Sequence, residues 1–107
     1  MIAIVKPTQE EHKLIMDFFP TRLPEVLDWS IIMQIVEKIE SLETEFDGRF
    51  GVYISSNSCT IQGTLFDSRR ETFKPAYWYE VVLETKIESV YHSCITFIKF
   101  WNQYHKK

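Results

Sequence analysis

The stretch Thr85–Lys107, TKIESVYHSCITFIKFWNQYHKK, decides the fold, because it carries more apolar and aromatic side chains than one side of a small core requires. Thr85 is followed three residues later by Glu88, which is the pattern of a capping box. In that motif the threonine hydroxyl accepts a hydrogen bond from the Glu88 amide, and the carboxylate reaches back to the cap. We therefore expect a helix from this cap to about Tyr104, with two lysines near its negative C-terminal end.

The apolar residues of this helix form two sets. The first set has the i, i+3, i+4, i+7 spacing of a core-facing stripe, and it consists of Ile87, Val90, Tyr91, Cys94, Ile98 and Trp101. The second set spreads around the rest of the circumference, and it consists of Ile95, Phe97, Phe100 and Tyr104. Either another broad helical stripe covers this excess, or it forms a surface for a protein partner, since exposed aromatic residues are common interface anchors. The candidate partner contacts on this helix are Phe97, Phe100, Trp101 and Tyr104.

The composition predicts one folded domain over residues 1–107. The chain is 45% hydrophobic, 25% charged and 15% aromatic, so bulky side chains can fill a core that a short chain could not otherwise make large. A net charge of −3 argues against general nucleic-acid binding, which relies on clustered lysine and arginine. No apolar run is long enough to span a membrane, and the start of the chain does not fit a secretory signal, so we expect a cytoplasmic protein.

Two helices are predicted in the first half of the chain. Thr8 can cap the first helix, which Pro20 ends. Asp28 can cap the second helix, which runs to about Glu43 and carries a broad apolar stripe. Residues 1–27 could form an N-terminal helical extension.

From residue 50 onward the hydrophobic period changes from about 3.6 to 2. Residues 50–56, 59–66 and 76–84 are predicted to form three strands, with a polar loop over 67–75. The predicted fold class is α+β, a three-stranded antiparallel β-meander packed by helices in the order α-α-β-β-β-α.

An acidic stretch begins in the second predicted helix and continues past its end. Its five carboxylates, against Lys38 alone, belong to Glu37, Glu40, Glu43, Glu45 and Asp47. The first three are spaced three residues apart and so lie roughly along one side of the helix. They form either a solvated outer face or a negative ridge that docks on a basic groove of the kind that holds RNA or DNA. Such a ridge would speed association.

A weaker alternative is direct RNA binding. The candidate residues combine positive charge with an aromatic ring, as in single-strand binding sites, and they are Arg69, Arg70, Lys74 and Trp78. The order α-β-β-β-α after Asp28 also resembles that of the double-stranded-RNA-binding domain, a family that places a lysine cluster at the start of its last helix. This chain has Lys86 alone at that place, between two glutamates, so we do not transfer the function.

The sequence predicts no catalytic residue, metal or cofactor. The three histidines, His12, His92 and His105, have no second histidine or cysteine at metal-ligand spacing. His92 and Cys94 are two residues apart, which separates their side chains by ~200° on a helix. Cys59 and Cys94 are expected to be reduced and buried.

The closing helix carries the pattern K-I-E-x-x-Y-x-x-C-x-x-F-I-K-x-x-N. It is formed here by Lys86, Ile87, Glu88, Tyr91, Cys94, Phe97, Ile98, Lys99 and Asn102. This ending resembles that of small uncharacterised proteins encoded by bacterial phages and prophages. Those proteins also place a β-meander before this helix and an earlier helix similar to VEKIESL, which is Val36–Leu42 here. The resemblance covers the chain after its first 27 residues.

The resemblance implies a setting rather than a chemistry. Small acidic phage proteins are often inhibitors or adaptors that act by binding host machinery, and anti-CRISPR proteins are the best-known group of this kind. We therefore predict a non-enzymatic binding protein in the cytoplasm of a bacterial host, an anti-CRISPR-like inhibitor that binds an RNA-guided nuclease or interferes with its guide RNA. The alternatives are a homodimeric structural or adaptor domain and a weak RNA-binding domain.

Overall fold

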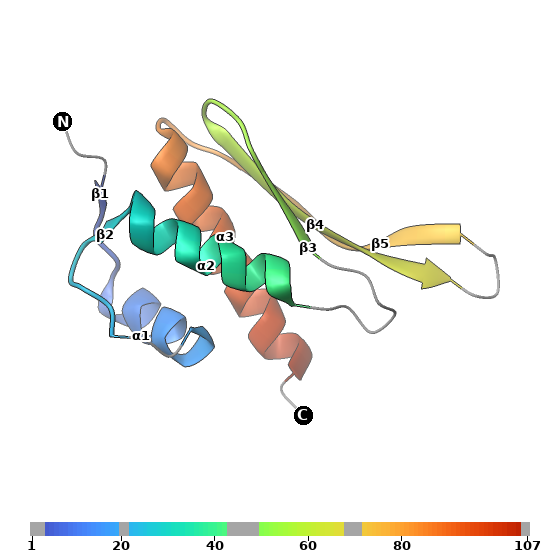
Figure 1. The fold of residues 1–107 in the computed structure, drawn as a ribbon, viewed down its shortest axis with the longest axis horizontal. Helices are drawn as coiled ribbons and strands as arrows, with labels where there is room; N and C mark the ends of the chain where they lie inside the picture. Colours follow the sequence, from blue (N-terminus) through green and yellow to red (C-terminus); the bar gives the residue numbers. More distant parts are fainter. Residues whose placement is uncertain (1–3, 20–21, 43–49, 68–71, 106–107) are drawn as a thin grey trace.

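The computed structural model describes residues 4–19, 22–42, 50–67 and 72–105. Figure 1 shows the helices on one side of a three-stranded sheet, with the elements in the order β1-α1-β2-α2-β3-β4-β5-α3. The predicted α+β class is confirmed. The predicted order α-α-β-β-β-α is incomplete, because it lacks the two short strands that form a second, two-stranded sheet.

The two short strands attach the N-terminal part of the chain to the rest. Strand β1 (Ile4–Val5) pairs antiparallel with β2 (Leu27–Asp28), on either side of α1 (Gln9–Phe18). A capping box starts α1: the Thr8 hydroxyl accepts from the Glu11 amide at 3.1 Å, and the Glu11 carboxylate accepts from the Thr8 amide at 3.1 Å. Four side chains from this part of the chain are buried in the common core, namely Ile15, Phe18, Leu23 and Leu27.

Helix α2 (Trp29–Ser41) begins at the predicted cap. The Asp28 carboxylate accepts a hydrogen bond from the Ile31 amide at 3.1 Å. The helix buries one apolar stripe, made of Ile32, Ile35, Val36 and Ile39. Its opposite side is exposed, which leaves a charged surface on an anchored helix.

Strands β3 (Phe50–Ile54), β4 (Ser58–Asp67) and β5 (Thr72–Val82) form the predicted antiparallel meander. Its β4–β5 hairpin is longer than expected, because part of the predicted loop 67–75 belongs to the two strands. The register shifts by one residue between Gly63 and Thr64, and beyond this bulge the hairpin extends away from the helices (Figure 1). The sequence pattern did not predict this arm, because strand residues that lie beyond the helices have no core to face and need not alternate between apolar and polar.

Helix α3 (Lys86–His105) is the centre of the fold. It lies against β4 and β5, against α2, and against α1 and β1. The hydroxyl of Ser89 donates to the Asn57 carbonyl at 2.7 Å, and the hydroxyl of Ser93 donates to the Cys59 carbonyl at 3.4 Å, which ties α3 to the sheet. After its first residue, the exposed described side chains of α3 form one narrow line, which we call the α3 polar line: Glu88, His92, Lys99 and Gln103.

Candidate functional site

The excess aromatic side chains of α3 are used mainly inside the molecule. Phe97, predicted as a partner contact, has 0% of its surface exposed, so that prediction is wrong. Its ring meets the Phe50 ring edge-on at 4.8 Å between centroids and the Phe18 ring at 6.4 Å, and it stacks on Trp101 at 6.0 Å. The physical reason is that α3 is covered by the sheet, α2 and α1 together, so a single core-facing stripe does not describe it.

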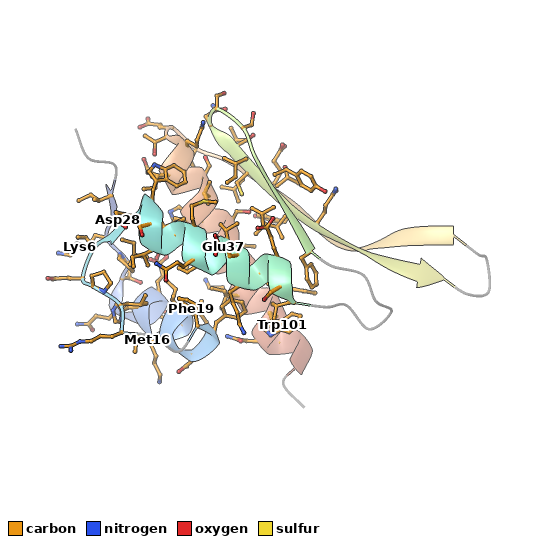
Figure 2. The ribbon with its side chains drawn as sticks, in the orientation of Figure 1. Lys6, Met16, Phe19, Asp28, Glu37 and Trp101 are labelled. Carbon is orange, nitrogen blue, oxygen red and sulfur yellow. The ribbon has the colours of Figure 1, made fainter. Side chains whose placement is uncertain are left out.

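The other predicted contacts of this helix offer less surface than expected. Phe100 and Trp101 are partly buried and pack against the core. Figure 2 shows Trp101 on the C-terminal half of α3. The side chain of Tyr104 lies outside the described part of the structure. The candidate site therefore has to be sought on other elements.

The exposed side of α2 carries the described part of the predicted acidic stretch. We call Met33, Glu37 and Glu40 the α2 acidic face; all three side chains are exposed, and Glu37 is labelled in Figure 2. Residues three and four apart on a helix are neighbours, so Met33 and both carboxylates lie along one side. The other predicted carboxylates, Glu43, Glu45 and Asp47, lie outside the described residues.

The charge of the α2 acidic face is not neutralised by the residues that the structure describes. Within them, neither Glu37 nor Glu40 has a hydrogen-bond or ion-pair partner. The nearby Ser41 hydroxyl donates instead to the Lys38 carbonyl at 2.6 Å, within the last turn. Two solvated carboxylates on a helix anchored by four buried apolar residues can meet a cationic partner without rearranging the fold.

Sequence reasoning missed a second exposed region, on the face of the large sheet that points away from the helices. Tyr53 on β3 is 57% exposed and Val82 on β5 is 56% exposed. The Tyr53 ring lies over Gly51. Between Tyr53 and Val82 on this face, the Thr60 hydroxyl on the central strand β4 donates to the Glu80 carboxylate on β5 at 3.4 Å. The sequence contained a signal for this exposed region, because side chains along a strand point alternately to the two faces of the sheet and cross-strand partners share a face.

The residues of the RNA-binding alternative are not brought into a described site. Arg69 and Arg70 lie outside the described residues. Lys74 and Trp78 belong to β5, but their side chains lie outside the described part. The alternative therefore stays a prediction from the sequence.

A polar cluster joins α1 to α3 and was not predicted. The Tyr91 hydroxyl donates to the Glu11 carboxylate at 2.7 Å, while that carboxylate also caps α1. Burial raises the pKa of Glu11, but the hydrogen bonds from the Thr8 backbone and from Tyr91 outweigh it, so the pKa lies below its ordinary value. Burial and the bond to Glu11 raise the pKa of Tyr91. An open pocket of about 370 Å³ next to this cluster is lined by β1, α1 and α3.

This cluster makes the stability of the fold depend on pH. We expect Tyr91→Phe to lower the free energy of unfolding by about 1–2 kcal/mol at pH 7, where the hydroxyl bonds a charged carboxylate. Because the folded pKa of Glu11 is below its ordinary 4.5, the stability it adds is present above that pH and is lost as the pH falls through the folded pKa. Urea denaturation at pH 7 and at pH 3 should therefore show a smaller loss at pH 3.

The control for this measurement is Tyr53→Phe, which removes a hydroxyl from an exposed ring. It should change the free energy of unfolding little at either pH. An equal loss at both pH values in Tyr91→Phe would show that packing, rather than the bond to Glu11, accounts for the effect.

The two cysteines are free and buried. Burial raises the pKa of both Cys59 and Cys94, and the repulsion that two neighbouring thiolates would feel raises the pKa of Cys94 further, so both thiols are protonated at neutral pH. Among the described residues, no group of three or more histidine, cysteine or acidic side chains is placed to hold a metal ion.

None of the helices in the described ranges is both long enough and apolar enough to cross a membrane. Comparison with known proteins found no matching family model, no matching curated protein and no matching solved structure.

Proposed function

We propose that this chain is a non-enzymatic binding protein of phage type, which acts in the cytoplasm of a bacterial host as an anti-CRISPR-like inhibitor of an RNA-guided nuclease. The α2 acidic face is its contact surface. One observation carries the proposal: Glu37 and Glu40 are exposed, and no described residue pairs with either carboxylate. The resemblance of the closing helix to phage-encoded proteins supports the setting.

The partner has a basic groove that normally holds RNA. Such grooves present lysine and arginine to the phosphates of a guide-RNA duplex. Carboxylates one turn apart on a rigid helix present negative charge to the same cations, and the exposed Met33, one turn before Glu37, adds an apolar contact at the end of the face. Charge attraction of this kind speeds association and weakens as salt is added.

The first experiment asks which nuclease, if any, is inhibited. Plasmid-clearance assays in cells that express different CRISPR effectors should show protection of the plasmid when this chain is co-expressed with its target effector. Purified chain should then bind that effector more strongly before guide loading than after it, because RNA and the α2 acidic face compete for one groove. Absence of protection against every effector tested would contradict the proposal.

The second experiment tests the contact surface. We expect the triple variant Glu37→Gln, Glu40→Gln, Glu43→Gln to associate with the effector on the order of tenfold more slowly, because charge steering of on-rates is lost. The salt dependence of the association rate should also become shallower. Both quantities can be measured by surface plasmon resonance at salt concentrations from about 50 to about 500 mM, over which the Debye length falls about threefold.

A matched control changes the same net charge elsewhere on the surface. Asp17→Asn, Glu25→Gln and Glu84→Gln together alter three exposed carboxylates on α1, on the loop before β2 and on the loop before α3. This variant should keep most of the association rate. If both triple variants slow association equally, overall charge rather than the α2 acidic face is responsible.

A further inference from the structure

The hydrogen-bonding direction of β5 identifies an open edge of the large sheet. The amide of Leu83 donates to the Asn57 carbonyl on the β4 side at 3.2 Å. Backbone groups of successive residues in an antiparallel strand point alternately to one neighbour and to the other. Counting back from Leu83, the residues whose N–H and C=O groups point away from β4 are Trp78, Glu80 and Val82. In the described sheet, β5 pairs with β4 alone.

This edge lacks the features that usually protect a free strand. Natural sheet edges carry lysine, proline or a bulge that discourages pairing with another chain. In β5, Pro75 and the bulge both lie in the distal arm, whereas the stretch Tyr77–Val82 contains one charged residue, Glu80. Tyr79 is 46% exposed on the side that faces the helices, so an aromatic ring lies open beside the edge. The opposite edge, β3, is shorter and α2 packs against it.

We propose that the edge of β5 pairs antiparallel with the same edge of a second copy of this chain, which joins the two meanders into a six-stranded sheet. This inference does not depend on the proposed function. The two-fold axis passes beside Tyr79, so that Tyr79 faces its counterpart and Trp78 lies opposite Glu80 of the second copy. In this register the stretch between the bulge and Val82 is paired, and the half-exposed Tyr79 rings cover each other.

Charge decides between this register and its neighbour. An axis through Glu80 would place two carboxylates directly opposite each other, and like charges in that position destabilise a sheet. A register shifted from this one by an odd number of residues would place backbone groups that point away from β4 in one copy opposite groups that point toward β4 in the other, and these could not pair. The Tyr79-centred register avoids both conflicts.

The α3 polar line is complementary to itself in this arrangement. Helix α2 covers one flank of α3 and packs on β3 at the far edge of the sheet. The polar line lies on the other flank, toward β5, where it also borders β1 and α1: Glu88 and His92 line one pocket with them, and Lys99 and Gln103 line another with α1. Across a two-fold axis the two α3 helices run antiparallel, so the end that carries Glu88 approaches the half of the other helix that carries Lys99. The α2 acidic face lies at the far edge and stays uncovered, so a dimer presents two copies of it.

The dimer is tested first by sedimentation velocity over a range of protein concentrations. A species of twice the 12.8 kDa chain mass is expected. Glu80→Pro removes one outward N–H from each copy and keeps the backbone bonds to β4, since proline is tolerated on an edge strand where its nitrogen faces outward; the one bond to β4 that it removes is the exposed side-chain bond from Thr60 at 3.4 Å. We expect the dissociation constant to rise about tenfold or more, since two hydrogen bonds are lost per dimer. The control, Glu80→Gln, keeps the N–H and should remain dimeric.

Disulfide cross-linking decides the register, and it decides the proposal if Glu80→Pro does not fold. Under mild oxidation Tyr79→Cys should form a covalent dimer, because opposed residues in a non-hydrogen-bonded pair have Cα atoms ~4.5 Å apart. Val81→Cys should not form a covalent dimer, since in this register Val81 of one copy lies opposite Tyr77 of the other, four residues away from the second Val81. A wild-type protein that is monomeric at all concentrations, a folded Glu80→Pro variant that dimerises normally, or cross-linking at Val81 rather than Tyr79 would each overturn the proposal.

Discussion

Phe97→Ala should lower the free energy of unfolding by about 3–5 kcal/mol, the usual cost of removing a large aromatic side chain from a core. The ring is fully buried and meets the rings of Phe18, Phe50 and Trp101. These rings come from α1, β3 and α3, so the cavity would open where three elements meet and could not close by shifting one of them. Since small domains are stable by only about 5–15 kcal/mol, urea denaturation should show a large loss.

The matched control is Tyr53→Ala, which also removes an aromatic ring but from an exposed position on the outer face of the sheet. Its cost should stay below about 1 kcal/mol, as for most surface substitutions. A loss below about 1 kcal/mol in Phe97→Ala, or equal losses in the two variants, would contradict the structure and would restore Phe97 as a candidate partner contact.

Local signals in the sequence predicted the starts of all three helices. Thr8, Asp28 and Thr85 each accept a hydrogen bond from the amide three residues later, as expected of caps. At Thr85 the box differs in one detail, because its hydroxyl donates to the Glu88 carboxylate at 2.7 Å. Caps involve neighbours in the chain, so their geometry can be inferred without knowledge of the fold.

The environment of α3 could not be inferred in this way. Periodicity identifies one apolar stripe, whereas the number of elements packed around a helix depends on tertiary structure. The small β1–β2 sheet, which pairs Ile4 with Asp28 across 24 positions, is another example. Such a two-residue pairing has no hydrophobic pattern that would identify it in the sequence.

The two candidate surfaces differ in the same way, since one could be predicted from local sequence and the other could not. The exposure of Glu37 and Glu40 follows from the position of the buried stripe of α2, so sequence reasoning placed both on the outer side. The open edge of β5 depends on strand order and on which backbone groups already pair with β4. Strand order is a property of the folded sheet, and the Tyr77–Val82 sequence alone is equally compatible with a central strand.

Gly63→Ala should lower the free energy of unfolding by about 1–3 kcal/mol, as expected of overpacking in a core. A Cβ added at Gly63 would lie 2.5 Å from Cδ1 and 2.6 Å from Cε1 of the Phe50 ring. That ring is buried and is held between Phe97, at 4.8 Å between centroids, and Trp101, at 6.0 Å. Phe50 therefore cannot move aside without disturbing the same aromatic cluster that Phe97→Ala would hollow out.

Gly51→Ala provides the comparison that isolates the cause. A Cβ there would also come too close to an aromatic ring, at 2.8 Å from Cε2 of Tyr53, but that ring is exposed and can swing into solvent. Alanine also restricts the unfolded chain more than glycine does, which favours the folded state by ~0.4–1 kcal/mol. Gly51→Ala should thus be neutral or slightly stabilising in the same urea titration. If the two glycine variants lose equal stability, a common effect on the strand backbone explains the result, and the fixed position of Phe50 in the core does not.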